Sequence, residues 1–181
     1  MNKSEIRKKI LKLRKNSNLD NFTINFKIIL NILKKEKIKG KVIGGYYPYN
    51  YELNGLQILE KFENQNYKVS LPKIKSDFKM NFFDWSINNP LMVNNFGIPE
   101  PISNKIKYPD VLLIPLVAFD KNLNRLGYGG GFYDRYIYKM KKIKKVLTIG
   151  LAYSFQKVKK IPINKHDIKL NYILTEKELQ K

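Results

Sequence analysis

The sequence predicts a three-layer α/β domain of Rossmann-like architecture, in which helices flank a mostly parallel central sheet. Segments with helical periodicity alternate with short strand-like segments along the chain. Two segments, residues 110–120 and 145–153, are almost continuously apolar, as central strands covered on both faces are. A glycine-rich loop then leads toward a helix, and the whole chain, residues 1–181, is expected to form this single domain.

Two amphipathic helices are expected near the N-terminus. The first has an apolar stripe at spacings of four and three, made of Ile6, Ile10 and Leu13. Its cationic side chains, Lys3, Arg7 and Arg14, are expected on a different face. Asp20 is expected to cap a second helix, whose stripe steps in the same way through Phe22, Phe26, Ile29 and Leu33. Lysines near its end and Gly40 after them are typical of a helix C-terminus.

The middle of the chain is predicted to form a buried strand, a helix and a second strand, at residues 41–47, 52–65 and 67–72. Residues 73–110 are the least regular part of the sequence. They include one predicted strand, MNFFDW at 80–85. Three prolines and a glycine in the turn-rich stretch 88–101 exclude a long regular element there.

The C-terminal half completes the expected sheet. Residues 110–120 form a central strand, a glycine-rich loop leads into a helix, and residues 145–153 and 167–175 form the last two strands. Ligands of such sheets bind beyond the carboxyl ends of the strands, so the loops that follow these strands are the first places to look for a site.

The charge of the chain raises the possibility of a nucleic-acid-binding module. The formal net charge is +20 and the isoelectric point is near 9.9, values typical of proteins that bind polyanions. However, 31 lysines stand against four arginines, and arginine is the residue that reads bases and clamps phosphates. Lysine, asparagine and isoleucine make up 73 of 181 residues, the bias that AT-rich codons produce at tolerant surface positions. A specific nucleic-acid partner is therefore not expected.

Composition excludes several other classes of protein. The absence of cysteine excludes disulfides, thiolate zinc sites and cysteine nucleophiles, and a single histidine excludes HExxH metal sites. The longest apolar stretch, residues 111–119, is far shorter than the roughly 18 residues of a membrane span. The N-terminus has no apolar core behind its charges. We expect a cytoplasmic protein without a membrane partner.

The strongest candidate for a chemical site is the segment 118–136. Four glycines at positions 127, 129, 130 and 131 precede a helix, and such a loop lets backbone N–H groups approach an anion. Arg125 before the glycines can hold phosphate oxygens, and Asp134 in the first helical turn can hold Mg²⁺. The segment does not match the Walker A or dinucleotide-binding patterns. A tight turn that only packs the helix, with Asp134 as a helix-start carboxylate, is the alternative.

Other polar residues are weaker candidates. Lys3 and Arg7 lie four apart and can reach a polyphosphate together, although an ordinary solvated helix face has the same pattern. Glu52 follows the first predicted strand at a loop edge where ligands bind, or is simply a helix-start carboxylate. His166 and Asp167 precede the last strand, where an Asp that bonds its own backbone is the alternative.

Four segments together resemble one known family. PLVAFDKNLNRLGYGGGFYDRY at 115–136 is similar to the signature of the 5-formyltetrahydrofolate cyclo-ligases, also called 5,10-methenyltetrahydrofolate synthetases. KSEIR at 3–7 resembles the family's Lys-x-x-x-Arg helix, FGIPEP at 96–101 its Gly-Ile-x-Glu-Pro element, and IPINKHDIKLNYILTE at 161–176 its closing strand. The resemblance spans nearly the whole chain and implies an enzyme that uses ATP and Mg²⁺ to close 5-formyltetrahydrofolate into 5,10-methenyltetrahydrofolate, with release of ADP and phosphate.

The resemblance also implies roles for individual residues. The residues implied to hold ATP are Lys3, Arg7, Arg125, Leu126, Gly127, Tyr128, Gly129, Gly130, Gly131, Phe132 and Tyr133. Those implied to contact the folate are Tyr47, Glu52, Tyr128, Gly129, Gly130, Gly131 and Phe132. Asp134 is implied to hold Mg²⁺, with Asp167 as a second candidate ligand. Arg125, Tyr133 and Asp134 are the implied catalytic residues.

The sequence departs from the family pattern at two positions. Phe132 stands where many members have tyrosine, and Asn171 replaces an aspartate in the last strand, so a phenol at 132 and a carboxylate at 171 have no role here. A non-catalytic nucleotide- or anion-binding α/β protein remains the main alternative, with the nucleic-acid-binding module behind it. We expect small-molecule partners and a monomer.

Overall fold

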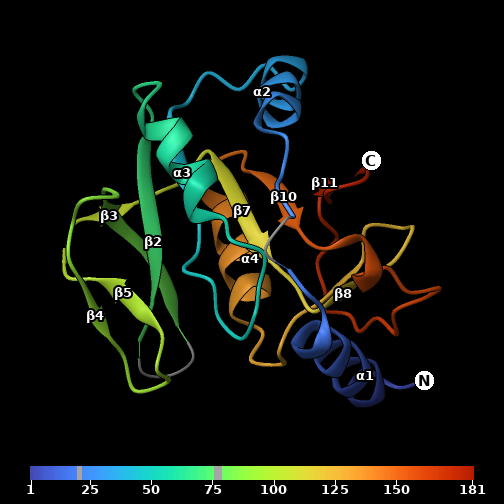
Figure 1. Ribbon diagram of the computed structural model, residues 1–181. Helices are drawn as coiled ribbons and strands as arrows, with labels where there is room; N and C mark the ends of the chain where they lie inside the picture. Colours follow the sequence, from blue (N-terminus) through green and yellow to red (C-terminus); the bar gives the residue numbers. More distant parts are fainter. Residues whose placement is uncertain (20–21, 76–78) are drawn as a thin grey trace.

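The computed structural model describes residues 1–19, 22–75 and 79–181, and within these ranges eight strands form one central sheet (Figure 1). Their order is β12 (Leu179–Gln180), β11 (Tyr172–Leu174), β10 (Leu147–Leu151), β7 (Val111–Pro115), β1 (Val42–Gly44), β2 (Lys68–Ile74), β3 (Met80–Trp85) and β6 (Ile106–Lys107). The neighbours from β11 to β2 pair in parallel, and the strands at both edges pair antiparallel. The mostly parallel sheet is thus confirmed.

Helices cover both faces of this sheet and give the three expected layers. α2 (Phe26–Lys35) and α3 (Leu56–Glu63) pack on one face, and α4 (Phe132–Ile143) packs on the other (Figure 1). Alternate residues of β7 pack into two hydrophobic cores, one on each face of the sheet. Val111 and Leu113 join the α2–α3 side, whereas Leu112 and Ile114 join the α4 side, which explains the continuous apolar run.

α1 (Lys3–Asn16) lies away from both faces of the sheet. It packs beside β8 (Ala118–Phe119) and β9 (Arg125–Leu126), which pair as a separate hairpin (Figure 1). The small core there contains Ile6, Ile10, Val117, Ala118, Leu126 and Ile161. The predicted stripe was wrong at its end, because Leu13 is 43% exposed and Arg14 is only 1% exposed. The buried stripe continues from Ile10 by four residues to Arg14. The Arg14 guanidinium donates a hydrogen bond to the buried carbonyl oxygen of Leu116.

The start of α2 also differs from the prediction. Asn25 caps this helix, and its side chain accepts a hydrogen bond from the backbone N–H of Lys27. Phe22 precedes the helix and packs edge-on against Tyr153 at 5.4 Å between ring centroids. The expected cap, Asp20, lies outside the described residues.

Several strands are shorter than the apolar pattern predicts. The segment 110–120 is divided, because Pro115 ends β7 and the chain then turns toward β8. The last strand begins at Tyr172 rather than at residue 167, and the first ends at Gly44 rather than at residue 47. The turn-rich region forms a hairpin that was not predicted, β4 (Leu91–Val93) with β5 (Pro99–Pro101). Within the described ranges, no helix combines the length and apolar character that crossing a membrane requires.

Candidate functional site

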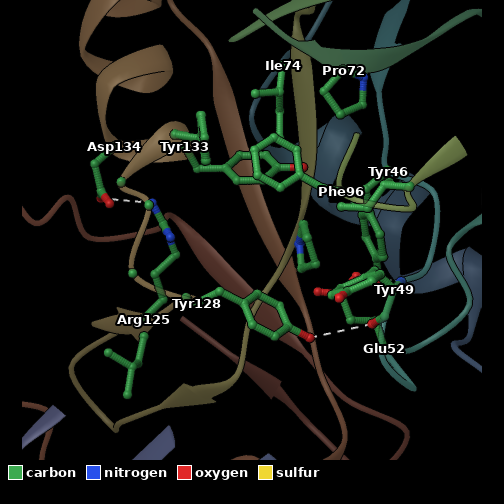
Figure 2. A pocket seen from close by; sticks show the side chains of 18 of the residues that line it. Tyr46, Tyr49, Glu52, Pro72, Ile74, Phe96, Arg125, Tyr128, Tyr133 and Asp134 are labelled. Atoms are coloured by element: carbon green, nitrogen blue, oxygen red, sulfur yellow. Dashed lines mark hydrogen bonds and ion pairs between the residues drawn. The ribbon is translucent and has the colours of Figure 1, made fainter. Parts of the chain in front are cut away.

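A pocket of about 610 Å³ opens at the carboxyl ends of β1 and β7, among α1, the glycine loop and the β4–β5 hairpin (Figure 2). It brings together every predicted site residue: Lys3, Arg7, Tyr47, Glu52, Arg125, Leu126, Gly127, Tyr128, Gly129, Gly130, Gly131, Phe132, Tyr133, Asp134 and Asp167. These residues come from four separate parts of the chain. The pocket lies where ligands of an α/β sheet are expected to bind, and the role of each residue stays a prediction.

Two glycines of the glycine loop have backbone conformations that other residues rarely adopt. Gly129 has φ +113° and Gly131, which caps α4, has φ +65°, conformations that glycine adopts readily. A Cβ atom at Gly129 would lie 3.5 Å from the guanidinium carbon of Arg7. Arg7 Nε also donates a hydrogen bond to the carbonyl oxygen of Gly127 at 2.7 Å. The loop and α1 thus face each other as two walls of one cationic pocket.

Two ion pairs face this end of the pocket. Arg125 Nη2 lies 2.8 Å from Asp134 Oδ1, which also accepts the backbone N–H of Ile168. Lys3 Nζ lies 2.5 Å from Asp167 Oδ2. Burial acts to raise the pKa of Asp167, but the hydrogen bond and the charge of Lys3 outweigh it and hold the pKa below its ordinary value. Two cations and two carboxylates are thus available for a phosphate chain and a divalent metal.

Asp167 fits both interpretations that the sequence left open. Its Oδ2 accepts the backbone N–H of Asn164 at 2.6 Å, so it does close a local turn. It also lines the pocket and pairs with Lys3 from the other end of the chain. A turn residue that faces the site can still exchange its cation for a metal ion.

Glu52 marks the opposite end of the pocket. It is not a helix-start carboxylate, because α3 begins four residues later, after Gly55. Its Oε2 accepts the backbone N–H of Tyr49 at 3.0 Å, and the side chain is buried. Burial raises the pKa of Glu52 to about 7, and the Tyr49 hydrogen bond and the charge of Arg14 only partly oppose this. A buried carboxylate beside an aromatic wall can accept hydrogen bonds from the donor edge of a heterocycle.

The wall between these two ends is mainly apolar and was not predicted residue by residue. It consists of Tyr46, Tyr49, Pro72, Ile74, Phe96, Ile98, Pro99 and Pro115. Phe96 is 61% exposed although it is a large aromatic residue, and Figure 2 shows it in the close-up of the pocket. The sequence signal for this wall is FGIPEP at 96–101, whose likeness to the family element assigns no role to its individual residues. Its position over the pocket depends on the β4–β5 hairpin.

One pocket therefore contains a cationic glycine loop, an apolar wall and the buried carboxylate of Glu52. The family model of the 5-formyltetrahydrofolate cyclo-ligase family matches residues 1–176. The chain belongs to this family. The match runs through α1, the hairpin, the glycine loop and the closing strand, so it includes every wall of the pocket.

Curated members of the cyclo-ligase family are similar over most of their length. The 5-formyltetrahydrofolate cyclo-ligase of Haemophilus influenzae is 35% identical over 152 residues, which cover 80% of this chain and 80% of that protein. The one from Mycoplasma pneumoniae is 37% identical over 164 residues, with 87% and 88% covered.

Solved structures agree with the cyclo-ligase family. A 5,10-methenyltetrahydrofolate synthetase from Mycoplasma pneumoniae has a TM-score of 0.73 at 28% identity, covering 97% of this chain and 99% of that one. The synthetase from Aquifex aeolicus has a TM-score of 0.77 at 31% identity, covering 100% and 93%. The fold class is thus that of known methenyltetrahydrofolate synthetases.

Of the two residues that depart from the cyclo-ligase pattern, Phe132 lies in the pocket and Asn171 lies beside the sheet. Phe132 lines the pocket, with the Arg135 guanidinium 5.4 Å from its ring centroid. Asn171 is a structural residue before β11. Its Oδ1 accepts hydrogen bonds from the backbone N–H and the hydroxyl of Thr148, at 2.9 and 2.8 Å. Asn171 does not line the pocket formed by the described residues.

Proposed function

We propose that this chain catalyses the ATP- and Mg²⁺-dependent cyclisation of 5-formyltetrahydrofolate to 5,10-methenyltetrahydrofolate, with release of ADP and phosphate. The observation that carries the proposal is the family match over residues 1–176, which includes every wall of one pocket. This pocket has the two parts that the reaction needs, a cationic glycine loop for a phosphate chain and a buried carboxylate for a pterin.

The reaction must turn the formyl oxygen into a leaving group. That oxygen attacks the γ-phosphorus of ATP, and the bond to ADP breaks. N10 of the folate then attacks the formyl carbon, the carbon–oxygen bond breaks, and phosphate leaves with the former formyl oxygen while N10 loses its proton. The protein supplies charge stabilisation on the phosphates and holds N10 close to the formyl carbon.

The cationic end of the pocket is the proposed ATP site. Lys3 and Arg7 of α1 face the segment from Arg125 to Tyr133, in which the backbone N–H groups of residues 127–131 precede the N-terminus of α4. Arg125 is proposed to stabilise the charge that develops on the transferring phosphoryl group. Tyr133 lies in the first turn of α4, beside Arg125, with 5.8 Å from the guanidinium carbon to its ring centroid. These contacts keep Arg125 directed at the pocket.

Mg²⁺ fits the donors at this end. Asp134 Oδ2 has no hydrogen-bond partner among the described residues, and Asp167 lines the same pocket. No cluster of three or more metal-ligating side chains occurs in the described part of the chain. Mg²⁺ typically takes one or two carboxylates together with substrate phosphates and water, so Asp134 with Asp167 is a suitable set. When bound, the ion would neutralise charge on the phosphates.

The other end of the pocket is the proposed folate site. Glu52 offers a carboxylate for the donor edge of the pterin, and Tyr47 follows β1 on the same side. The residues from Tyr128 to Phe132 line the same pocket as Glu52, so they are proposed to line the formyl group as well as to hold ATP. The remaining properties follow the same proposal: small-molecule partners, a monomer, a cytoplasmic location, and no specific nucleic acid.

Turnover tests this proposal. The purified chain is mixed with 5-formyltetrahydrofolate and MgATP, and the near-ultraviolet absorbance of the methenyl product is followed. We expect product that is lost with a chelator or without ATP, and lost in the double variant Arg125→Ala, Asp134→Ala. ATP binding without turnover would contradict the proposal and favour a non-catalytic nucleotide-binding protein.

A further inference from the structure

The side chain of Arg14 connects three segments around the pocket, although it is not among the pocket-lining residues. It is 1% exposed near the C-terminal end of α1. Its Nη2 donates to the carbonyl oxygen of Leu116 at 2.6 Å. Its Nη1 donates to the hydroxyl of Tyr128 at 2.9 Å and to the carbonyl oxygen of Asn50 at 3.4 Å. One guanidinium therefore links α1 to the chain after β7, to the glycine loop and to the loop before Glu52.

The loop before Glu52 has an unusual backbone that needs such support. Asn50 and Tyr51 are consecutive non-glycine residues with φ +48° and +59°. The left-handed conformation is strained for a bulky residue and persists only where surrounding contacts hold it. The hydrogen bond from Arg14 to Asn50 is one such contact. A second is the hydroxyl of Tyr128, which donates to the carbonyl oxygen of Tyr49 at 3.4 Å.

We infer that Arg14 is a positioning residue, which holds the 49–52 loop directly and through Tyr128, so that the Glu52 carboxylate faces the folate end of the pocket. A guanidinium suits this task because its fixed fork makes several directed hydrogen bonds at once, which a lysine ammonium does not reproduce. The inference rests on the proposed function, since it assumes that Glu52 contacts the folate.

Arg14 also acts on Glu52 through its charge. The groups that interact electrostatically with the Glu52 carboxylate are Arg14 from α1, Tyr46 from the end of β1, Tyr128 from the glycine loop and Tyr133 from α4. Arg14 is the cation in this set, and it lowers the pKa of Glu52. Its removal should therefore raise that pKa and leave less carboxylate at neutral pH.

The test compares Arg14→Met and Arg14→Lys with Lys15→Met, a control that removes one exposed positive charge from the next position of α1. For Arg14→Met we expect the KM for 5-formyltetrahydrofolate to rise about tenfold or more. The KM for ATP should change less than about twofold, and the acid limb of kcat/KM for the folate should move to higher pH. Arg14→Lys should restore the pH limb but only part of the folate KM. Lys15→Met should behave as wild type.

A second variant and a second measurement make the result decisive. If Arg14→Met does not fold, Arg14→Lys tests the same link, since it keeps the charge and removes the fork of donors, and a raised folate KM with an unmoved acid limb is expected. A ¹³C NMR titration of the Glu52 carboxyl, assigned with Glu52→Gln, is independent of turnover. An inactive wild type would contradict the proposed function, while the titration still decides whether Arg14 controls Glu52. A folded Arg14→Met with wild-type folate KM and an unshifted Glu52 titration would overturn the inference.

Discussion

The proposed folate contact uses the charged form of the Glu52 carboxyl group, whereas burial disfavours that charged form. Burial raises its pKa in the folded protein to about 7, whereas an unfolded chain ionises near ~4.3. Ionisation therefore opposes folding. The contribution of this group to stability is greatest below the unfolded pKa and is lost as the pH rises through about 7.

The variant Glu52→Gln tests both the cost of the Glu52 charge to stability and its role in folate binding. It should raise the melting temperature relative to wild type above neutral pH, and much less at about pH 4, below the unfolded pKa of about 4.3, where Glu52 is largely protonated in both the folded and the unfolded chain. It should also lower kcat/KM for 5-formyltetrahydrofolate by about 10- to 100-fold, because an amide cannot replace a carboxylate as a double acceptor. Thermal unfolding at the two pH values and initial rates measure both effects. Glu60→Gln, at an exposed position of α3, is the control. Equal stability differences at both pH values would contradict the assignment.

The two candidate metal carboxylates are already paired with cations. Asp134 pairs with Arg125 and Asp167 with Lys3, so both carboxylates already interact with a positive charge, which opposes the binding of Mg²⁺ alone. ATP phosphates give those cations new partners. We therefore expect ATP to bind roughly tenfold or more tightly with Mg²⁺ than without it, and Mg²⁺ alone to bind weakly.

Calorimetric titrations of Mg²⁺, of ATP and of both together measure this coupling. In Asp134→Asn, the tighter binding of ATP with Mg²⁺ should disappear. Tight binding of Mg²⁺ to the chain without nucleotide would show that the ion pairs do not compete with the metal.

The backbone conformation of the glycine loop can be tested directly by substitution. Gly129 has φ +113° and faces the Arg7 guanidinium, so Gly129→Ala should strain the loop and move it away from the phosphate chain. We expect kcat/KM for ATP to fall about tenfold or more, with a stability loss of about 1–3 kcal/mol. Gly97→Ala is the matched control, since Gly97 also has positive φ but no atom within 4 Å of an added Cβ. A similar loss of ATP efficiency in both variants would argue against a phosphate cradle at Gly129.

Local patterns predicted the type of most elements but not their ends. The apolar run at 110–120 identified β7, yet only tertiary structure decides that the chain turns after Pro115 to form β8. The helical period of α1 was clear, but periodicity alone does not decide between Leu13 and Arg14 as the buried neighbour. That choice depends on the β8–β9 hairpin, which lies more than a hundred residues away in sequence and supplies the partner surface of α1.

In the whole molecule, the predicted site residues lie in one pocket because parallel pairing places the carboxyl ends of neighbouring strands at the same edge of the sheet. Parallel pairing of β1 with β7 places Glu52 and the glycine loop at the same edge of the sheet. The apolar wall around Phe96 was harder to predict. A hairpin of two three-residue strands gives little periodic signal, and its packing over the pocket is a long-range contact. The net charge of +20 gave no guide to the site, which depends on a few fixed cations.

In the proposed reaction, one pocket holds ATP and folate together and a phosphoryl group passes between them. The most direct test uses 5-formyltetrahydrofolate labelled with ¹⁸O in the formyl group, and follows the released phosphate by ³¹P NMR. Transfer to the formyl oxygen predicts that each phosphate released during cyclisation carries one ¹⁸O atom. Phosphate without the label, while methenyl product still forms, would contradict phosphorylation of the formyl group.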